Sequence, residues 1–175
     1  MKEKILEEIL KNEGKKVFNM ILRMVRQRQE AEDLFQEVFV AFYENIEKVQ
    51  ESALKSYLYR IAYNKTLNKI KARKRDLKFL MGQLNQPQIA EEKESATEKR
   101  NKLIRESLAL LKPQEALLIE LQFFQGKSYH EISEIIGKSE SAVDSRLVRA
   151  KKRLHDILES NGINKLQDNL LAAVL

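Results

Sequence analysis

The sequence has no cysteine and no tryptophan, and only five glycines, two prolines and two histidines among its 175 residues. Without cysteine the chain has no disulfide framework, no thiolate zinc site and no cysteine nucleophile. The scarcity of glycine and proline, with an apolar share of 43%, excludes collagen-like, low-complexity and wholly disordered classes. The sequence indicates no metal site, no cofactor and no catalytic residue.

Long apolar runs are also absent, because no stretch approaches the roughly 18 consecutive apolar residues of a membrane helix. The N-terminal segment 1–10 mixes charged and apolar residues and lacks a signal-peptide core. We therefore expect a cytoplasmic protein that is not inserted in a membrane. The net charge of +6 comes from two basic blocks, residues 1–80 and 100–160, on either side of an acidic spacer. A basic excess suits a polyanion, but it also suits any well-solvated helical surface.

Apolar residues recur at three and four positions along most of the chain, which predicts helices and no strand. We expect one short helix that stops near Gly14, a second over 17–25, a third over 30–46, and a fourth from a Ser52 cap to about Lys74. Further helices are expected over 103–111 and from Pro113 to Gly126. The predicted fold is all-α, with two small helical domains (1–76 and 101–160), a flexible linker (77–100) and an apolar C-terminal tail (161–175).

The pattern of residues 128–158 is typical of a helix-turn-helix. Ser128 and Glu131 form a capping box, Gly137 closes the short helix they open, and Ser139 caps a longer one. The longer helix has an inward apolar stripe of Val143, Leu147, Ala150, Leu154 and Leu158. Its outer side carries Ser141, Ser145, Val148, Arg149 and Lys152. Small and basic residues suit a helix that enters the major groove of DNA, and the alternative is a solvated basic face.

The helix from Ser52 carries a polar face with one aromatic residue. A helical wheel places Tyr57, Arg60, Asn64, Asn68 and Lys71 within about 80° of arc. Aromatic rings can stack on unstacked bases, amides can read base edges and lysines can neutralise phosphate, so this face suits opened DNA. The alternative is that the tyrosines of this helix are packing residues and its lysines are merely solvated.

Three segments in this order resemble the extracytoplasmic-function group of bacterial sigma-70-type sigma factors. They are Ala31-Glu32-Asp33-Leu34-Phe35-Gln36-Glu37, then Tyr57-Leu58-Tyr59-Arg60-Ile61-Ala62-Tyr63-Asn64, then the helix-turn-helix with Ser145-Arg146-Leu147-Val148-Arg149. The resemblance covers about residues 15–75 and 103–158. It implies two domains like sigma regions 2 and 4, with core RNA polymerase and promoter DNA as partners. It also implies an anti-sigma factor or other regulatory protein, and no small-molecule substrate.

The resemblance assigns expected roles to individual residues. Asp33, Gln36 and Glu37 would bind the polymerase. The minus-10 promoter element would be recognised by Tyr57, Arg60, Asn64, Asn68 and Lys71, and the minus-35 element by Ser141, Ser145, Arg146, Arg149 and Lys152. The sequence departs from the family at four positions: tryptophan is frequent at Tyr57, an apolar residue at Lys65, aspartate at Asn68 and a basic residue at Asp144. The promoter sequence therefore cannot be inferred from relatives.

Two other functions are weighed beside a sigma factor. One is a stand-alone helix-turn-helix regulator whose N-terminal half senses a signal or dimerises. It would need no polymerase contact. The other is an enzyme acting on nucleic acid, for which the sequence offers no carboxylate cluster or nucleophile at suitable spacing. The histidines His130 and His155 are interpreted as ordinary surface or packing residues.

Overall fold

The structure is a computed structural model that describes residues 2–80 and 106–160, and all of its regular elements in these ranges are helical. The N-terminal part consists of α1 (Lys2–Val25), α2 (Arg28–Asn45) and α3 (Leu54–Leu80), with the 3-10 turns η1 (Ile46–Lys48) and η2 (Glu51–Ala53) between α2 and α3. The C-terminal part begins with the helical residues 106–110, which lie in the predicted helix 103–111. It continues with α5 (Pro113–Ile119), the π-helical turn η3 (Glu120–Phe124), α6 (Tyr129–Ile136) and α7 (Glu140–Ser160). The all-α prediction is confirmed, whereas the proposed tail and most of the proposed linker lie outside the described residues.

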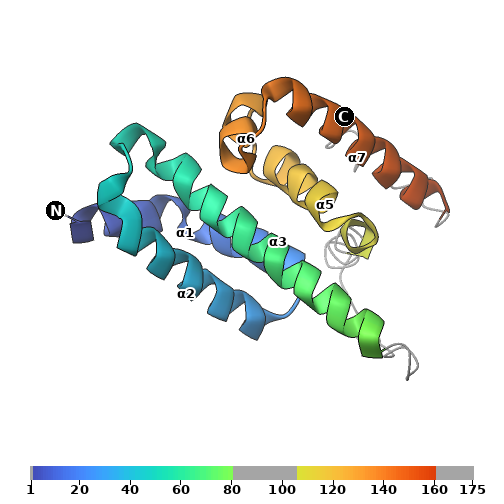
Figure 1. The fold of residues 1–175 in the computed structure, drawn as a ribbon, viewed down its shortest axis with the longest axis horizontal. Coiled ribbons are helices and arrows are strands. Elements are labelled where there is room, and N and C mark those ends of the chain that lie inside the picture. The colour runs from blue at the N-terminus through green and yellow to red at the C-terminus, as the bar shows by residue number, and fades with distance from the viewer. Residues whose placement is uncertain (1, 81–105, 161–175) are drawn as a thin grey trace, which may run out of the picture.

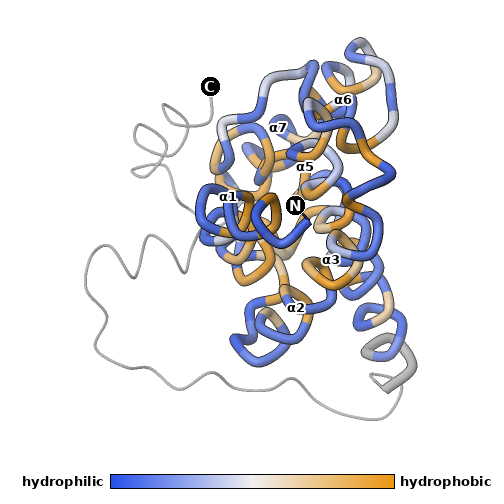
Figure 2. The backbone as a smooth tube through the Cα atoms, turned by 90° about the vertical axis from the view of Figure 1, so that its left-hand side faces the viewer, coloured by the Kyte–Doolittle hydropathy of each residue, from blue (hydrophilic) through white to orange (hydrophobic). Residues whose placement is uncertain are grey.

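The helices form two bundles that share α3 as a common wall. Helices α1, α2 and α3 make the first bundle, and α5, α6 and α7 make the second, which lies against α3 (Figure 1). Apolar stretches gather where the helices face one another (Figure 2). In the first bundle the buried side chains include Met20, Ile21, Val38, Phe42 and Leu58. In the second they include the predicted stripe of α7 together with Leu117, Leu121, Ile132 and Ile135.

The predicted helix break at Gly14 is wrong, because α1 runs without interruption from Lys2 to Val25. Gly14 is buried between α1 and α2, and a Cβ added there would lie 3.0 Å from a methyl group of Leu10 and 3.8 Å from the ring of Phe35. A glycine inside a helix costs about 1 kcal/mol relative to alanine. The tight contact is with Leu10 of α1 itself, and the Phe35 ring of α2 would lie at ordinary contact distance. The helix continues through Gly14 because α1 packs along its length on α2 and α3, so tertiary packing overrides the local preference.

Two predicted helix ends also differ from the structure. Ser52 does not cap α3, since it lies inside the η2 turn and α3 begins at Leu54. The helix that begins at Pro113 changes at Glu120 into a π-helical turn, where the Gln125 amide donates to the Glu120 carbonyl over 3.0 Å. The turn ends just before Gly126, which has a φ of 62°. Gly126 was therefore correctly predicted as the end of this segment, but the π-helical turn was not foreseen.

Candidate nucleic-acid interface

The polar face of α3 is exposed and held by contacts on the opposite side of the helix. Arg60, Asn64, Asn68 and Lys71 are exposed, and Tyr57 is half-buried with its ring centroid 6.2 Å from that of Phe42. At 1.5 Å per residue the face extends over about 20 Å. The structure thus brings all five predicted minus-10 residues onto one side of one helix.

Ion pairs along α2 fix the rotation of α3. Lys65 lies 3.1 Å from Glu37, while Lys69 and Arg73 lie 4.0 and 3.5 Å from Glu30. The guanidinium group of Arg73 also donates to the backbone carbonyl of Val25 over 2.8 Å. Each exposed ion pair of this kind contributes up to about 1 kcal/mol to the free energy of unfolding. Together, these pairs orient the polar face of α3.

The other two tyrosines of this helix are packing residues. Tyr59 and Tyr63 are buried, and the Tyr59 hydroxyl donates to the Glu13 carboxylate over 2.9 Å. Burial and the neighbouring Glu13 charge raise the pKa of Tyr59, so the phenol keeps its proton as a donor. Burial favours the neutral form of Glu13, but the bonds from Tyr59 and Lys55 outweigh it and lower the pKa of Glu13. The packing alternative therefore holds for these two rings but not for the whole face.

The helix-turn-helix has the predicted local geometry. The Glu131 amide donates to the Ser128 hydroxyl over 3.1 Å, and the Ser128 amide donates to the Glu131 carboxylate over 2.8 Å. Gly137 ends α6 with a φ of 65°. The Ala142 amide donates to the Ser139 hydroxyl over 3.3 Å at the start of α7. These caps fix the turn that aims the outer side of α7 away from the bundle.

The outer side of α7 carries four of the five predicted minus-35 residues. Ser141, Ser145, Arg149 and Lys152 are exposed, and the Arg149 side chain donates to the Ser145 carbonyl over 3.1 Å. Arg146 is half-buried instead, and lies close enough to Tyr63 of α3 to oppose the burial that raises the pKa of that phenol. Arg146 therefore lies near the first bundle, and it also lines one hollow with Arg149.

A basic hollow between α5 and α7 was not foreseen. It is lined by Lys112, Gln114, Glu115, Leu118, Arg146, Arg149 and Arg153. Within it Arg153 donates through one nitrogen to both Glu115 carboxylate oxygens, over 2.7 and 2.9 Å. Concave basic sites of this kind suit phosphate. Sequence periodicity could place Arg153 on α7, but Lys112 reaches the hollow only through tertiary folding.

The three predicted polymerase-binding residues lie on the outer side of α2. Asp33, Gln36 and Glu37 are all exposed. Gln36 also lines an apolar groove of about 540 Å³ between α1 and α2, together with Leu6, Leu10, Phe35, Phe39, Val40 and Tyr43. Val40 leaves 58% of its surface exposed there. Sequence reasoning missed this groove, which forms only where α1 and α2 lie side by side.

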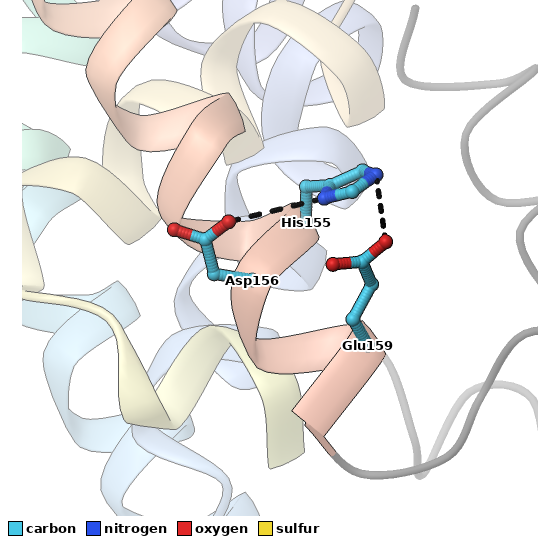
Figure 3. Close-up of side chains that lie close together, drawn as sticks. All are labelled: His155, Asp156 and Glu159. Carbon is cyan, nitrogen blue, oxygen red and sulfur yellow. Dashed lines mark ion pairs between the residues drawn. The ribbon is translucent and has the colours of Figure 1, made fainter.

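The histidines contact carboxylates on exposed surface. His130 Nδ1 lies 2.9 Å from Glu140, which with the nearby Glu134 raises the pKa of the imidazole. His155, Asp156 and Glu159 form the one metal-like cluster within residues 2–80 and 106–160. Its two carboxylates face different ring nitrogens, at 3.9 and 3.6 Å (Figure 3). A metal uses one nitrogen of an imidazole, so this arrangement is typical of ion pairs. Both histidines thus fit the interpretation that they are ordinary surface or packing residues.

Comparison with known proteins assigns each of the two bundles to a family of protein domains. The family model of sigma-70 region 2 matches residues 9–76, and that of sigma-70 region 4 matches residues 101–154. Among curated proteins, the RNA polymerase sigma factor SigZ of Bacillus subtilis is 30% identical over 79% of this chain and 78% of its own length. The chain belongs to the sigma-70 family, in its extracytoplasmic-function group. The first bundle is therefore its region 2, and the second its region 4.

Other sigma factors are similar in sequence along most of the chain. The RNA polymerase sigma factor YlaC of Bacillus subtilis is 28% identical over 85% of this sigma factor and 89% of its own length. The extracytoplasmic-function sigma factor SigM of the same organism is 26% identical over 91% and 98%. The family resemblance given by the three sequence segments is thereby confirmed.

Solved structures share the fold at 20% identity. The sigma factor RpoE, in complex with the anti-sigma factor NepR from Bartonella quintana, superimposes with a TM-score of 0.65 and covers 87% of this chain and 95% of its own. CnrH, in complex with the cytosolic domain of CnrY, gives 0.66 over 89% and 88%. Within the described ranges, this sigma factor has no helix long and apolar enough to cross a lipid bilayer.

Proposed function

We propose that this chain acts as a sigma factor that brings core RNA polymerase to promoters, with region 2 holding the opened minus-10 element and region 4 reading the minus-35 element. The observation that carries this proposal is the presence of two separate DNA-suited faces, on α3 and α7, in the two bundles that match sigma regions 2 and 4. The corresponding division of the chain is 1–76 and 101–160, with 77–100 as linker and 161–175 as tail, but α3 continues to Leu80 and takes in the first four residues of that linker.

The α3 face would capture bases after the strands separate. Unstacking a base costs a few kcal/mol, which one small domain offsets only if the duplex is already held in register. Tyr57 offers a ring for stacking, Asn64 and Asn68 offer amides for base edges, and Arg60 and Lys71 offer cations for phosphate. Because the face is one row on a rigid helix, successive bases meet successive side chains.

The α7 face would hold the upstream duplex. Ser141 and Ser145 are small enough to let the helix backbone approach the major groove, and Arg149 and Lys152 reach guanine edges or phosphates. Arg149, and also Arg146, line the basic hollow beside α5, which would receive a phosphate of the same duplex. Region 4 thus supplies the anchor that the α3 face requires.

The outer side of α2 would bind the polymerase. Asp33, Gln36 and Glu37 provide a polar edge, and the adjacent groove provides an apolar surface on which Val40 is exposed. An apolar centre with a polar rim is the usual composition of a specific protein interface. We place this interaction in the cytoplasm, where bacterial core polymerase works.

An anti-sigma factor is the proposed regulator. The similar structures of RpoE and CnrH were solved as complexes, the first with the anti-sigma factor NepR and the second with the cytosolic domain of CnrY. A partner of the same class would compete with the polymerase for the surfaces of α2 and α3. The test is to purify this chain from cells and identify the proteins that remain bound to it. If neither a soluble nor a membrane-bound inhibitor is retained, that result would count against this partner.

Transcription from a random promoter library tests the function. Core polymerase alone, core plus this chain, and core plus a resident sigma factor are compared by sequencing the transcripts. We expect initiation with this chain alone, at start sites that share two upstream elements at constant separation. Activity only in the presence of the resident sigma factor would instead support the stand-alone regulator, which needs no polymerase contact of its own.

A further inference from the structure

A small pocket lies where α1, α3 and the N-terminal part of region 4 meet. It has a volume of about 130 Å³, and no carboxylate of the described residues lines it. Its apolar lining includes Met24, Ile70, Leu108 and Ala116. Its charged lining is entirely cationic and consists of Arg23, Arg26, Arg73 and Lys74. We propose that this pocket binds a small aromatic anion, with the ring on the apolar side chains and the negative charge on the cations.

The volume and the apolar lining of the pocket limit the size of its ligand. Pockets for drug-sized molecules have volumes of about 300–1,000 Å³, well above that of this one. An apolar cavity of about 150 Å³ can bind benzene, so a single six-membered ring is close to the upper limit here. The apolar side chains favour burial of such a ring but offer it no hydrogen bond. The charged group of the ligand therefore sets its orientation.

The four cations of the pocket outnumber the carboxylates that pair with them. Two ion pairs neutralise half of these charges, over 2.7 and 3.5 Å, and they are Arg23–Glu120 and Arg73–Glu30. Lys74 donates to a backbone carbonyl of region 4 over 3.3 Å, and neither Lys74 nor Arg26 has an ion pair within residues 2–80 and 106–160. Carboxylates and phosphates form their strongest hydrogen bonds with such cations. An anion in the pocket would meet two positive charges that remain uncompensated there.

The backbone of Arg26 gives a second, independent indication of a site. Its φ of 69° makes it the one non-glycine residue with a positive φ in the described part of the chain. The Arg26 amide donates to the Leu22 carbonyl over 2.8 Å just after the end of α1, at a position that glycine usually takes. A side chain adds strain in this conformation, and strain of this kind is concentrated at functional sites. What glycine could not supply is the exposed guanidinium group that lines the pocket.

Positive charge extends beyond the pocket along α3. Lys74 and Pro113 also line a second hollow, of about 440 Å³, together with Asn68, Lys71 and Arg75. No carboxylate of the described residues lines this hollow either. Neighbouring charges of one sign raise the local concentration of anions, so the second hollow attracts the ligand toward the pocket. The shared chemistry is an aromatic ring with one anionic group, and both a carboxylate and a phosphate ester provide it.

Both regions of the sigma factor contribute to this pocket. Helices α1 and α3 of region 2 supply all four cations, whereas Leu108 and Ala116 of region 4 supply part of the apolar lining. A ligand that binds only the assembled pocket stabilises the contact between the two regions by mass action. The ligand would therefore act as an effector of their arrangement. This site is a property of the free chain, so the inference does not rest on the proposed function.

Nuclear magnetic resonance of the full chain with labelled methionine methyl groups tests the inference. Met24 lines the pocket, whereas Met20 is completely buried in the first bundle and serves as an internal reference. Benzoate and phenyl phosphate are the test ligands, benzamide has the ring without the charge, and acetate has the charge without the ring. We expect saturable shifts of the Met24 methyl group with a dissociation constant of about 1 mM or lower for at least one aromatic anion. Benzamide and acetate should bind at least about tenfold more weakly.

Two variants separate a specific site from general attraction of anions. Arg26→Gln removes the exposed guanidinium group and should weaken binding of the aromatic anion at least about fivefold, with no effect on benzamide. Lys15→Gln removes the same charge from an exposed position of α1 that does not line the pocket, and should leave the affinity unchanged. Melting curves establish that each variant is folded. The inference would be overturned by an unshifted Met24 methyl group, by equal affinities for benzoate, phenyl phosphate and benzamide, or by equal affinities of the two variants.

Discussion

At the scale of single residues, exposure separates the side chains of α3 that fold the protein from those available to a partner. Tyr59 and Tyr63 are buried, whereas Asn64 is exposed on the same helix. The exposed amide contributes no core packing, and surface substitutions of this kind change the free energy of unfolding by within about 0.5 kcal/mol. Asn64 is therefore the residue at which a DNA contact can be tested with little effect on folding.

We expect Asn64→Ala to reduce initiation from a library-selected promoter about tenfold, because losing one base contact costs roughly 1–3 kcal/mol. The loss should appear in run-off transcription with core polymerase, while the melting temperature stays the same. Asn19→Ala, which removes an exposed amide from α1, is the matched control. An equal loss in both variants, or none in Asn64→Ala, would contradict the minus-10 role of Asn64.

At the scale of elements, the helix-turn-helix depends on a backbone conformation that glycine adopts easily. Gly137 ends α6 with a φ of 65°, and a Cβ placed there would meet no atom within 4 Å. An added side chain would therefore cost backbone strain but cause no steric clash. We expect Gly137→Ala to lower the free energy of unfolding by about 1–2 kcal/mol.

Gly137→Asn is the control, because asparagine tolerates the left-handed conformation better than alanine and should recover part of this loss. Chemical denaturation followed by circular dichroism measures both changes. If the alanine and asparagine variants lose equal stability, or if neither does, the strain argument for this turn fails.

The same elements show which features a sequence can reveal. The Ser128 and Glu131 caps, the Gly137 turn and the α7 stripe were all predicted because each depends on residues within a few positions of one another. Gly14 was misread because α1 is kept continuous by its packing on α2 and α3, which involves residues far apart in the sequence. The same limit hid the contact of Arg60 with Glu134, 74 residues apart, and the α5–α7 hollow. No local pattern encodes such contacts.

At the scale of the whole molecule, α3 carries three separate tasks on three sides. One side packs on α1 and α2, a second is covered by α6 and α5, and the third is the exposed polar face, whose Arg60 also donates to the Glu134 carbonyl of α6 (Figure 1). The covered side ends in Lys74, which donates to the Leu111 carbonyl of region 4 over 3.3 Å. Any change that moves region 4 therefore alters the surroundings of the promoter-binding face directly.

This arrangement predicts unequal tolerance to spacing in the protein and in the promoter. Ten Gly/Ser residues inserted after Gln86, in the proposed linker 77–100, would raise the loop entropy cost by only about 0.3 kcal/mol, since that cost grows with the logarithm of length. We expect run-off transcription to change less than about twofold.

By contrast, about five base pairs inserted between the two promoter elements rotate one element by half a turn, which should reduce initiation more than about tenfold. Equal losses from the two insertions would mean that regions 2 and 4 are coupled through a linker of fixed geometry. In that case the linker, and not the polymerase, would set the separation of regions 2 and 4 on DNA.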